Sequence, residues 1–122
     1  MAVRYVIDTN VAIYFTEGRL AEDMPIGEYA YSVITEIELL SWSGITETEE
    51  EAFRVLLQPM QCIQLTDSVK QQTIALRRQH QLKLPDAIIA ASAVVREAVL
   101  LTNDKRLATI PEVQVRSLPL KT

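Results

Sequence analysis

Short apolar segments alternate with amphipathic ones along the whole of this 122-residue chain. The apolar segments are mostly rich in β-branched and aromatic residues, which predicts buried strands. We expect strands at residues 3–7, 29–31, 62–65, 99–101 and 113–115. The segments between them place apolar side chains three or four positions apart, which predicts helices. This alternation of strands and helices is typical of an α/β fold with a mainly parallel sheet.

Local signals mark the ends of several expected helices. Thr46 followed by Glu49 has the spacing of a capping box, so a helix should start there and end before Pro59. Gly18 and Gly44 are expected to end the two helices before it, because glycine is common just after a helix. The expected helices cover residues 11–15, 32–42, 47–58, 67–76, 86–95 and 105–108.

The composition is that of a protein with a well-developed core. With 48% hydrophobic residues in 122 positions, we expect one domain over residues 1–122. No apolar run approaches the ~20 residues that span a bilayer, and the start has no signal-peptide pattern. Cys62 is the only cysteine, so no internal disulfide can form, and we expect it to be a small core residue. These features predict a cytoplasmic protein.

The charged and polar residues exclude several kinds of active site. The net charge of −4 is not the electrostatic pattern of a nucleic-acid-binding protein, so any such activity needs a local basic patch or metal ions. His80 is the only histidine, which leaves little material for a Ser-His-Asp or Cys-His mechanism. The three glycines are scattered, so no phosphate-binding loop is present and we expect no nucleotide triphosphate chemistry.

Acidic residues follow two of the predicted strands. Asp8 ends the first strand and Asp104 lies just after the fourth. Parallel strands bring their carboxyl ends to one edge of the sheet, which is where ligands bind in open α/β folds. Asp86 opens a helix, and Glu36 and Glu38 lie early in another, so they are expected near that edge as well. At most one of the two glutamates can point into a site, because residues two apart face different sides of a helix.

A cluster of carboxylates at one edge needs a counter-charge, because the acids repel one another unless they are protonated or bridged by a cation. Sites made of oxygen ligands suit Mg²⁺ or Mn²⁺, which activate water and stabilise charge on phosphodiesters. Each acid also has a purely structural interpretation. Asp8 or Asn10 can cap the following helix. Asp86 and Asp104 can stabilise helix N-termini, and the residues alone leave both interpretations open.

Four short motifs occur in a characteristic order and spacing. They are Ile-Asp-Thr-Asn at 7–10, Ser-Val-Ile-Thr-Glu-Ile-Glu-Leu at 32–39, Leu-Pro-Asp-Ala-Ile-Ile-Ala at 84–90 and Leu-Thr-Asn-Asp at 101–104. In these motifs the chain resembles the PIN-domain family, and specifically the VapC-type ribonuclease toxins of VapBC toxin–antitoxin modules. The resemblance covers essentially the whole chain. It implies a three-layer α/β/α fold with a mainly parallel sheet of four to five strands.

The resemblance also implies a set of site residues. Four acids match the family's catalytic and metal-binding positions: Asp8, Glu38, Asp86 and Asp104. Glu38 is selected over Glu36 because the family's helical acid comes six residues after the serine, here Ser32. Asn10 matches a polar position that supports the turn, and Thr102 matches a hydroxyl position beside the site.

Cofactor and partners are implied in the same way. Proteins of this family are endoribonucleases that depend on Mg²⁺ or Mn²⁺, and they are usually homodimers. They are inhibited by an antitoxin, here a VapB-type protein, which typically inserts a segment, often bearing an arginine, into the acidic pocket. The acidic net charge departs from what RNA binding needs, so affinity for RNA would be weak and salt-sensitive. Contact with RNA would fall to a few basic residues: Arg77, Arg78, Lys83, Lys105 and Arg106.

Two other functions stay open. A haloacid-dehalogenase-type phosphatase also begins with a strand that ends in aspartate. Its chemistry needs a second aspartate two residues later, where this chain has Asn10. A non-catalytic binding module with the PIN fold would keep the architecture but not bind Mn²⁺. The four intact acids favour the nuclease over the binding module, as Asn10 does over the phosphatase.

Overall fold

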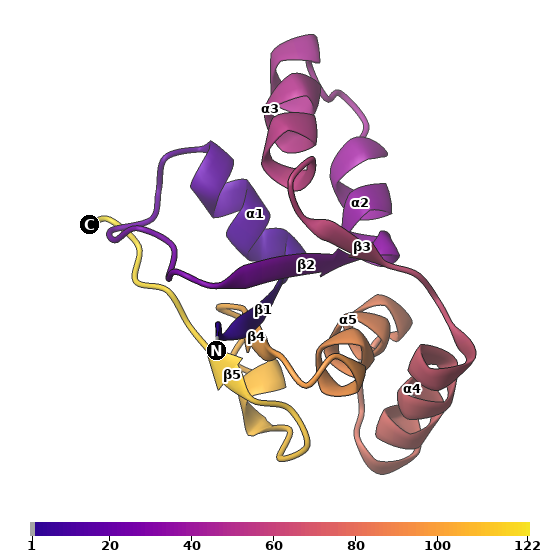
Figure 1. The fold of residues 1–122 in the computed structure, drawn as a ribbon. Helices are drawn as coiled ribbons and strands as arrows, with labels where there is room; N and C mark the ends of the chain where they lie inside the picture. The colour runs from indigo at the N-terminus through magenta and orange to yellow at the C-terminus, as the bar shows by residue number, and fades with distance from the viewer. Residues whose placement is uncertain (1) are drawn as a thin grey trace.

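Within residues 2–122, the part of the chain that the computed structural model describes, five parallel strands form the central sheet (Figure 1). They are β1 (Arg4–Ile7), β2 (Glu28–Ser32), β3 (Gln61–Ile63), β4 (Val99–Leu101) and β5 (Val115–Arg116). Their order across the sheet is β3-β2-β1-β4-β5. Every pair of neighbouring strands is parallel, which confirms the predicted α/β class and makes the sheet wholly parallel.

Helices cover both faces of this sheet, which gives three layers. They are α1 (Thr9–Thr16), α2 (Val33–Leu40), α3 (Glu47–Leu57), α4 (Asp67–Gln79) and α5 (Leu84–Val95). α1 and α3 pack on one face and α4 and α5 on the other, while α2 touches helices of both layers. The helix predicted at 105–108 is instead a 3₁₀ turn at Leu107–Thr109. None of the helices within residues 2–122 is long and apolar enough to cross a membrane.

The alternation of side chains along each strand divides the core into two halves. Val6, Ala30 and Leu100 point toward α4 and α5. Their neighbours Ile7 and Leu101 point toward α1 and α3. Because all of these side chains are buried, the strands are apolar on both faces, as expected for a parallel sheet between two helical layers.

α5 is buried along most of its length. Every residue from 87 to 93 is buried, and most of them are alanine or serine, which lets the helix lie close to the sheet. The hydroxyl of Ser92 is satisfied inside the core by the carbonyl of Ile88, with Oγ and O 2.8 Å apart. Pro85 lies in the first turn, where its missing N–H costs no helical hydrogen bond. These features hold the start of α5, and with it Asp86, at the carboxyl edge of the sheet.

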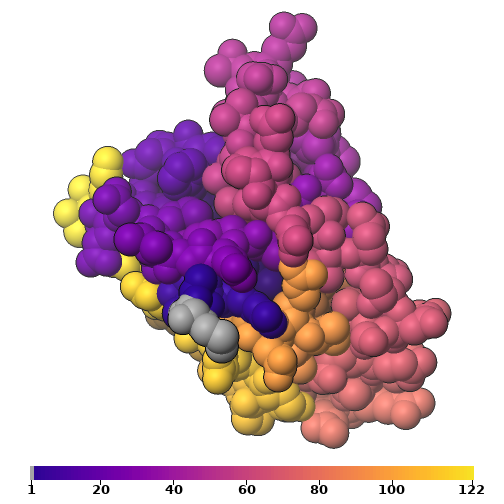
Figure 2. Space-filling model, viewed as in Figure 1, coloured from indigo at the N-terminus to yellow at the C-terminus, as the bar shows by residue number. Residues whose placement is uncertain are grey.

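The predicted local signals act as expected, with one difference. The Thr46 hydroxyl accepts from the N–H of Glu49 at 3.1 Å, and the Glu49 carboxylate accepts from the N–H of Thr46 at 3.0 Å, which confirms the capping box. Gly18 has a φ of 69° and lies just after α1. Gly44, with a φ of 87°, does not end α2, which stops at Leu40; it turns the chain toward α3 instead. α2 and α3 project together from the rest of the molecule (Figure 2).

The strand order changes direction at β1. From β1 the chain first adds β2 on one side and later adds β4 on the other. Such a change leaves a crevice at the carboxyl ends of the two strands, which is where ligands bind in this class of sheet. The hydrogen-bond ladder continues past the strand ends there, because the N–H of Asp8 donates to the carbonyl of Leu101 at 2.9 Å. The residues that follow β1 and β4 therefore meet at this crevice.

Candidate active site

Asp8 is a buried carboxylate at the carboxyl end of β1, with 5% of the residue exposed. Its Oδ1 accepts from the N–H of Thr9 at 2.8 Å and so caps α1. Its Oδ2 accepts from the hydroxyl of Thr102 at 2.6 Å and from the amide of Asn10 at 3.2 Å. The capping and site interpretations of Asp8 are therefore compatible, since one oxygen caps the helix while the other faces the end of β4.

The environment of Asp8 favours its protonated form. Burial raises its pKa from 3.8 to about 6, because desolvation disfavours the charged carboxylate. The Thr102 hydroxyl and the Thr9 N–H oppose this shift by stabilising the ionised form. The charges of Asp86 and Glu38 add to the rise, so two acids on other elements lie near enough to act on Asp8.

Thr102 connects the Asp8 turn to the loop after β4. Its Oγ1 donates to Asp8 and accepts from the backbone N–H of Asp104 at 3.0 Å. Asn10 lies beside both segments: its Nδ2 is 3.4 Å from Thr102 Oγ1, and its Oδ1 accepts from the N–H of Asn103 at 3.4 Å. Thr102 and Asn10 therefore hold the two strand ends together.

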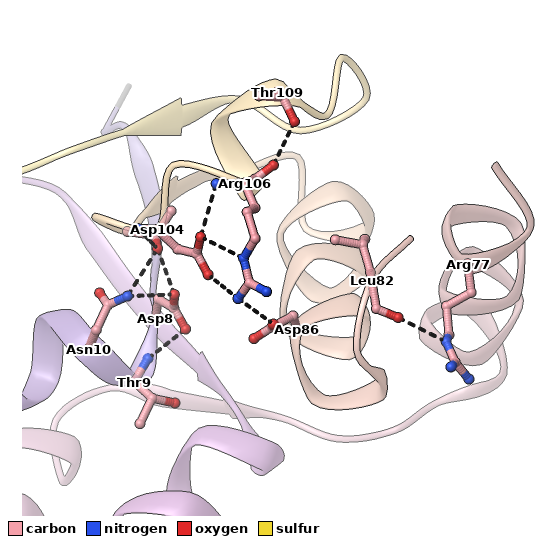
Figure 3. A network of polar contacts seen from close by, with 10 residues as sticks. Asp8, Thr9, Asn10, Arg77, Leu82, Asp86, Asp104, Arg106 and Thr109 are labelled. Atoms are coloured by element: carbon pink, nitrogen blue, oxygen red, sulfur yellow. Dashed lines mark hydrogen bonds and ion pairs between the residues drawn. The ribbon is translucent and has the colours of Figure 1, made fainter. Parts of the chain in front are cut away.

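Arg106 contacts both Asp86 and Asp104, the other two aspartates predicted at the site (Figure 3). Its Nη2 lies 2.9 Å from Asp104 Oδ2 and 3.5 Å from Asp86 Oδ2, and its Nε lies 3.3 Å from Asp104 Oδ1. The guanidinium is the main reason why the pKa of Asp104 lies below its usual range. Asp86 on α5 and Asp104 after β4 thus share one positively charged group.

Glu38 is the glutamate of α2 that contacts the Asp8 turn. Its Oε1 lies 2.6 Å from the hydroxyl of Thr9, the residue after Asp8. Glu36 lies elsewhere, near Cys62, where burial and then the charge of Glu36 raise the pKa of the thiol. The fold therefore brings Glu38, and not Glu36, to the edge where Asp8 lies. Cys62 itself is half-buried and packs against the core on the α1 and α3 side of the sheet.

The donor set at this edge consists of carboxylate and hydroxyl oxygens, the ligands that Mg²⁺ and Mn²⁺ prefer. Among residues 2–122, no three His, Cys, Asp or Glu side chains lie close enough together to form a ready-made metal site. Arg106 binds Asp86 and Asp104, and Thr9 binds Glu38. The four acids are therefore of the right chemical type to bind Mg²⁺ or Mn²⁺. In this structure their carboxylates are bound by Arg106 and Thr9 instead.

The basic residues predicted to contact RNA fall into two groups. Lys83 precedes α5 and its charge acts on Asp104, and Lys105 and Arg106 follow Asp104 directly, so all three lie close to Asp104 in space or in sequence. The other two, Arg77 and Arg78, lie in the last turn of α4. Arg77 donates to the carbonyl of Leu82 at 3.3 Å, away from the acidic residues (Figure 3).

An apolar groove of about 450 Å³ adjoins Glu38 between α1, α2 and α3. Its apolar lining consists of Ile13, Leu39, Trp42, Ala52 and Phe53. Trp42 is 56% exposed, which is unusual for so large an apolar side chain. Glu17 and Glu49 line the groove together with Glu38, so it combines an apolar surface with negative charge.

Two further residues at the site, Thr9 and Thr35, are not among those predicted from the sequence. The Thr9 hydroxyl lies between Glu38 and Thr35, 3.2 Å from Thr35 Oγ1. Thr35 is fully buried. A signal for it exists in the sequence, since Thr35 lies three positions before Glu38 and therefore on the same side of the helix.

A model of one known protein family matches most of this chain. The model of the PIN domain matches residues 5–113. The chain belongs to the PIN-domain family. This match confirms the resemblance carried by the four motifs.

Solved structures of toxin–antitoxin complexes contain the same fold. A chain of VapBC2 from Rickettsia felis, bound to a DNA fragment from its promoter, has a TM-score of 0.81 at 20% identity over 96% of this chain and 100% of that one. A chain of a toxin–antitoxin complex from Klebsiella pneumoniae is 33% identical, with a TM-score of 0.73 over 89% and 94% of the two chains. A chain of DNA-bound VapBC from Salmonella typhimurium has a TM-score of 0.74 at 19% identity, over 94% of this chain and 98% of that one. None of the curated proteins matches the chain.

Proposed function

We propose that this PIN-domain protein is a metal-dependent endoribonuclease and the toxin of a VapBC-type toxin–antitoxin module. The observation that supports this is a continuous set of contacts at one edge of the sheet, which links four acids from four separate segments of the chain. The linked residues are, in order, Glu38, Thr9, Asp8, Thr102, Asp104, Arg106 and Asp86.

In this proposal Asp8, Glu38, Asp86 and Asp104 bind Mg²⁺ or Mn²⁺. The ion, when bound, would supply an activated water and stabilise the negative charge that develops on the phosphodiester. The protein's own contribution is to orient the ligands. Thr102 and the Thr9 N–H hold the two oxygens of Asp8 in place, and the Thr102 hydroxyl also fixes the backbone of Asp104. Asn10 supports both strand ends.

A haloacid-dehalogenase-type phosphatase is a weaker candidate. That chemistry needs an acid two residues after the nucleophile, and here Asn10 occupies the position and donates its amide to Asp8. An amide cannot exchange a proton with a leaving group as a carboxylate can. A non-catalytic PIN-fold binding module remains the main alternative, and metal binding separates it from the nuclease.

The deciding experiment is the incubation of purified protein with total cellular RNA in Mg²⁺ or Mn²⁺. EDTA and the Asp8→Ala variant serve as controls. We expect discrete cleavage that both controls abolish, with the variant still folded by circular dichroism. Cleavage that survives in Asp8→Ala would contradict the assignment. Failure of the protein to bind Mn²⁺ at all would favour the non-catalytic module.

The choice between the two glutamates of α2 has its own test. Glu38→Gln should lose cleavage and weaken Mn²⁺ binding, because Glu38 is the one that reaches the Asp8 turn through Thr9. Glu36→Gln is the matched control, with the same chemical change two residues away on the same helix. Equal losses in both variants would show that the helical ligand is not Glu38 alone.

We further propose that the groove beside Glu38 receives a segment of a VapB-type antitoxin. Its apolar lining and its three glutamates suit an amphipathic segment that carries basic residues. The solved complexes from Rickettsia felis, Klebsiella pneumoniae and Salmonella typhimurium are toxin–antitoxin assemblies with chains of this fold. We also propose that the protein forms a homodimer, as the family implies, and that it acts in the cytoplasm.

A further inference from the structure

Arg106 reaches the site from its rim. Its side chain is 65% exposed, whereas those of Asp86 and Asp104 are 25% and 20% exposed. The guanidinium therefore covers two less exposed carboxylates without being packed into the core itself. An arginine in this position can swing away while the rest of the fold stays in place.

The contacts of Arg106 use the oxygens that a bound cation would need. Nη2 is shared between Oδ2 of Asp86 and Oδ2 of Asp104, and Nε and the backbone N–H both point at Oδ1 of Asp104. A guanidinium has only donors and is always charged, so it cannot join a cation's ligand shell. The carboxylate oxygens of Asp86 and Asp104 can therefore bind either the guanidinium or a divalent ion, and the two compete for them.

One of these contacts does not involve the side chain. The backbone N–H of Arg106 donates to Asp104 Oδ1 at 2.9 Å, and the backbone N–H of Asp104 donates to Thr102. Both bonds stay when the guanidinium leaves. Asp104 therefore remains oriented toward the site, which makes exchange of its counter-charge possible without rearrangement of the loop.

We propose that Arg106 is a built-in competitor of the divalent cation at Asp86 and Asp104, and that ion binding releases its guanidinium from both carboxylates. The inference rests on the proposed function, because it takes these two aspartates as metal ligands. Arg106 thus lowers the affinity of the site for the ion. The released guanidinium can donate two parallel hydrogen bonds to a phosphate group. Ion binding would therefore free Arg106 to contact the RNA backbone.

The first test is a calorimetric titration of the full-length protein with Mn²⁺, comparing wild type, Arg106→Ala and Lys83→Ala. Lys83 is the matched control, because its charge also acts on Asp104 but within the described residues it makes no ion pair with either aspartate. Because an exposed ion pair contributes little, its loss in Arg106→Ala should tighten Mn²⁺ binding by only about two- to fivefold. The gain in Lys83→Ala should be clearly smaller. Equal gains would mean that only long-range charge matters and would overturn the proposal.

The second test follows the arginine directly by NMR during a Mg²⁺ titration. The Nε–H resonance of Arg106, assigned by its loss in Arg106→Ala, should shift and exchange faster with solvent as the ion binds. An unchanged resonance at saturating Mg²⁺ would show that the guanidinium stays in place.

The two tests separate this proposal from the function on which it rests. Mn²⁺ binding and RNA cleavage by the wild type, combined with an unaltered Mn²⁺ affinity in Arg106→Ala, would overturn the role of Arg106 alone. Absence of Mn²⁺ binding in all three proteins would overturn both.

Discussion

The hydroxyl of Thr102 donates a 2.6 Å hydrogen bond to Oδ2 of Asp8, a residue 94 positions earlier in the chain. This bond joins the carboxyl ends of β1 and β4, the two strands between which the site lies. It also stabilises the ionised form of a carboxylate whose burial favours the neutral form. Thr102 therefore opposes the effect of burial and extends toward lower pH the range in which Asp8 is ionised.

The variant Thr102→Val keeps the shape of the side chain but removes the hydroxyl, which donates to Asp8 and accepts from the N–H of Asp104. We expect the pKa of Asp8 to rise above its value of about 6, because burial then acts with less opposition. Mn²⁺ binding should weaken most at the acidic end and recover as the pH rises, as followed by calorimetry over about pH 5 to 8. Thr102→Ser retains the donor and should keep the wild-type profile. Identical profiles for Val and Ser would rule out this role of the hydroxyl.

The variant Asp8→Asn should stabilise the protein at neutral and alkaline pH. The folded state holds the Asp8 proton more tightly than the unfolded state, because the pKa is about 6 rather than 3.8. Asp8 therefore lowers the free energy of unfolding as the pH rises from 3.8 to about 6, and the loss is complete above that pH. Below pH 3.8 both states are protonated and Asp8 costs nothing. A shift of this size corresponds to about 3 kcal/mol in the free energy of unfolding.

Urea unfolding at about pH 8 and about pH 4 measures this difference. Asparagine remains a good N-cap for α1, so the capping contribution changes little. Its amide nitrogen cannot accept from Thr102 and Asn10 as Oδ2 does, which reduces the gain equally at both pH values. We expect a gain of up to about 3 kcal/mol at the higher pH, which shrinks as the pH falls. A gain of equal size at both values would mean that ionisation of Asp8 is not its source.

The variant Trp42→Ala tests the groove as the antitoxin site. Large aromatic side chains at interfaces often contribute about 2 kcal/mol or more when truncated, so we expect about thirtyfold weaker binding of a VapB-type antitoxin. Val55→Ala on α3 is the control, because Val55 is exposed but does not line the groove. Trp42 is the only tryptophan, so its fluorescence reports the same event in the wild type. An affinity equal to that of the control would place the partner elsewhere.

The variant Gly27→Ala should destabilise the fold by about 1–3 kcal/mol through overpacking. A Cβ at this position would lie 2.4 Å from the carbonyl oxygen of Val3 and 2.7 Å from the ring of Tyr5. Gly18→Ala is an informative comparison, because its Cβ meets nothing and its cost, about 1–2 kcal/mol, comes only from a positive φ. Urea unfolding measures both. Gly27 precedes β2, at the opposite edge from Asp8, so the folded fraction of the variant should keep its activity.

Much of the fold was predictable because its signals are local. The capping box at Thr46 and Glu49 forms as expected, since its partners lie three residues apart. Each predicted strand overlaps an observed one, because burial on both faces of the sheet requires an apolar run. The last strand was misplaced: it begins at Val115 rather than at 113, where edge position makes the apolar signal weak.

The sequence by itself determined that Asp8 and Asp104 would lie at one edge, because each follows an apolar strand of a parallel sheet. It also determined the family, through motifs that are short and local. The tertiary structure alone decided which side chains touch. Arg106 binds Asp86 across 20 residues and Thr9 binds Glu38 across 29, so both contacts depend on how α5 and α2 pack against the sheet. Periodicity places a residue on a face of its own element, but the distance between two elements is set by the core between them.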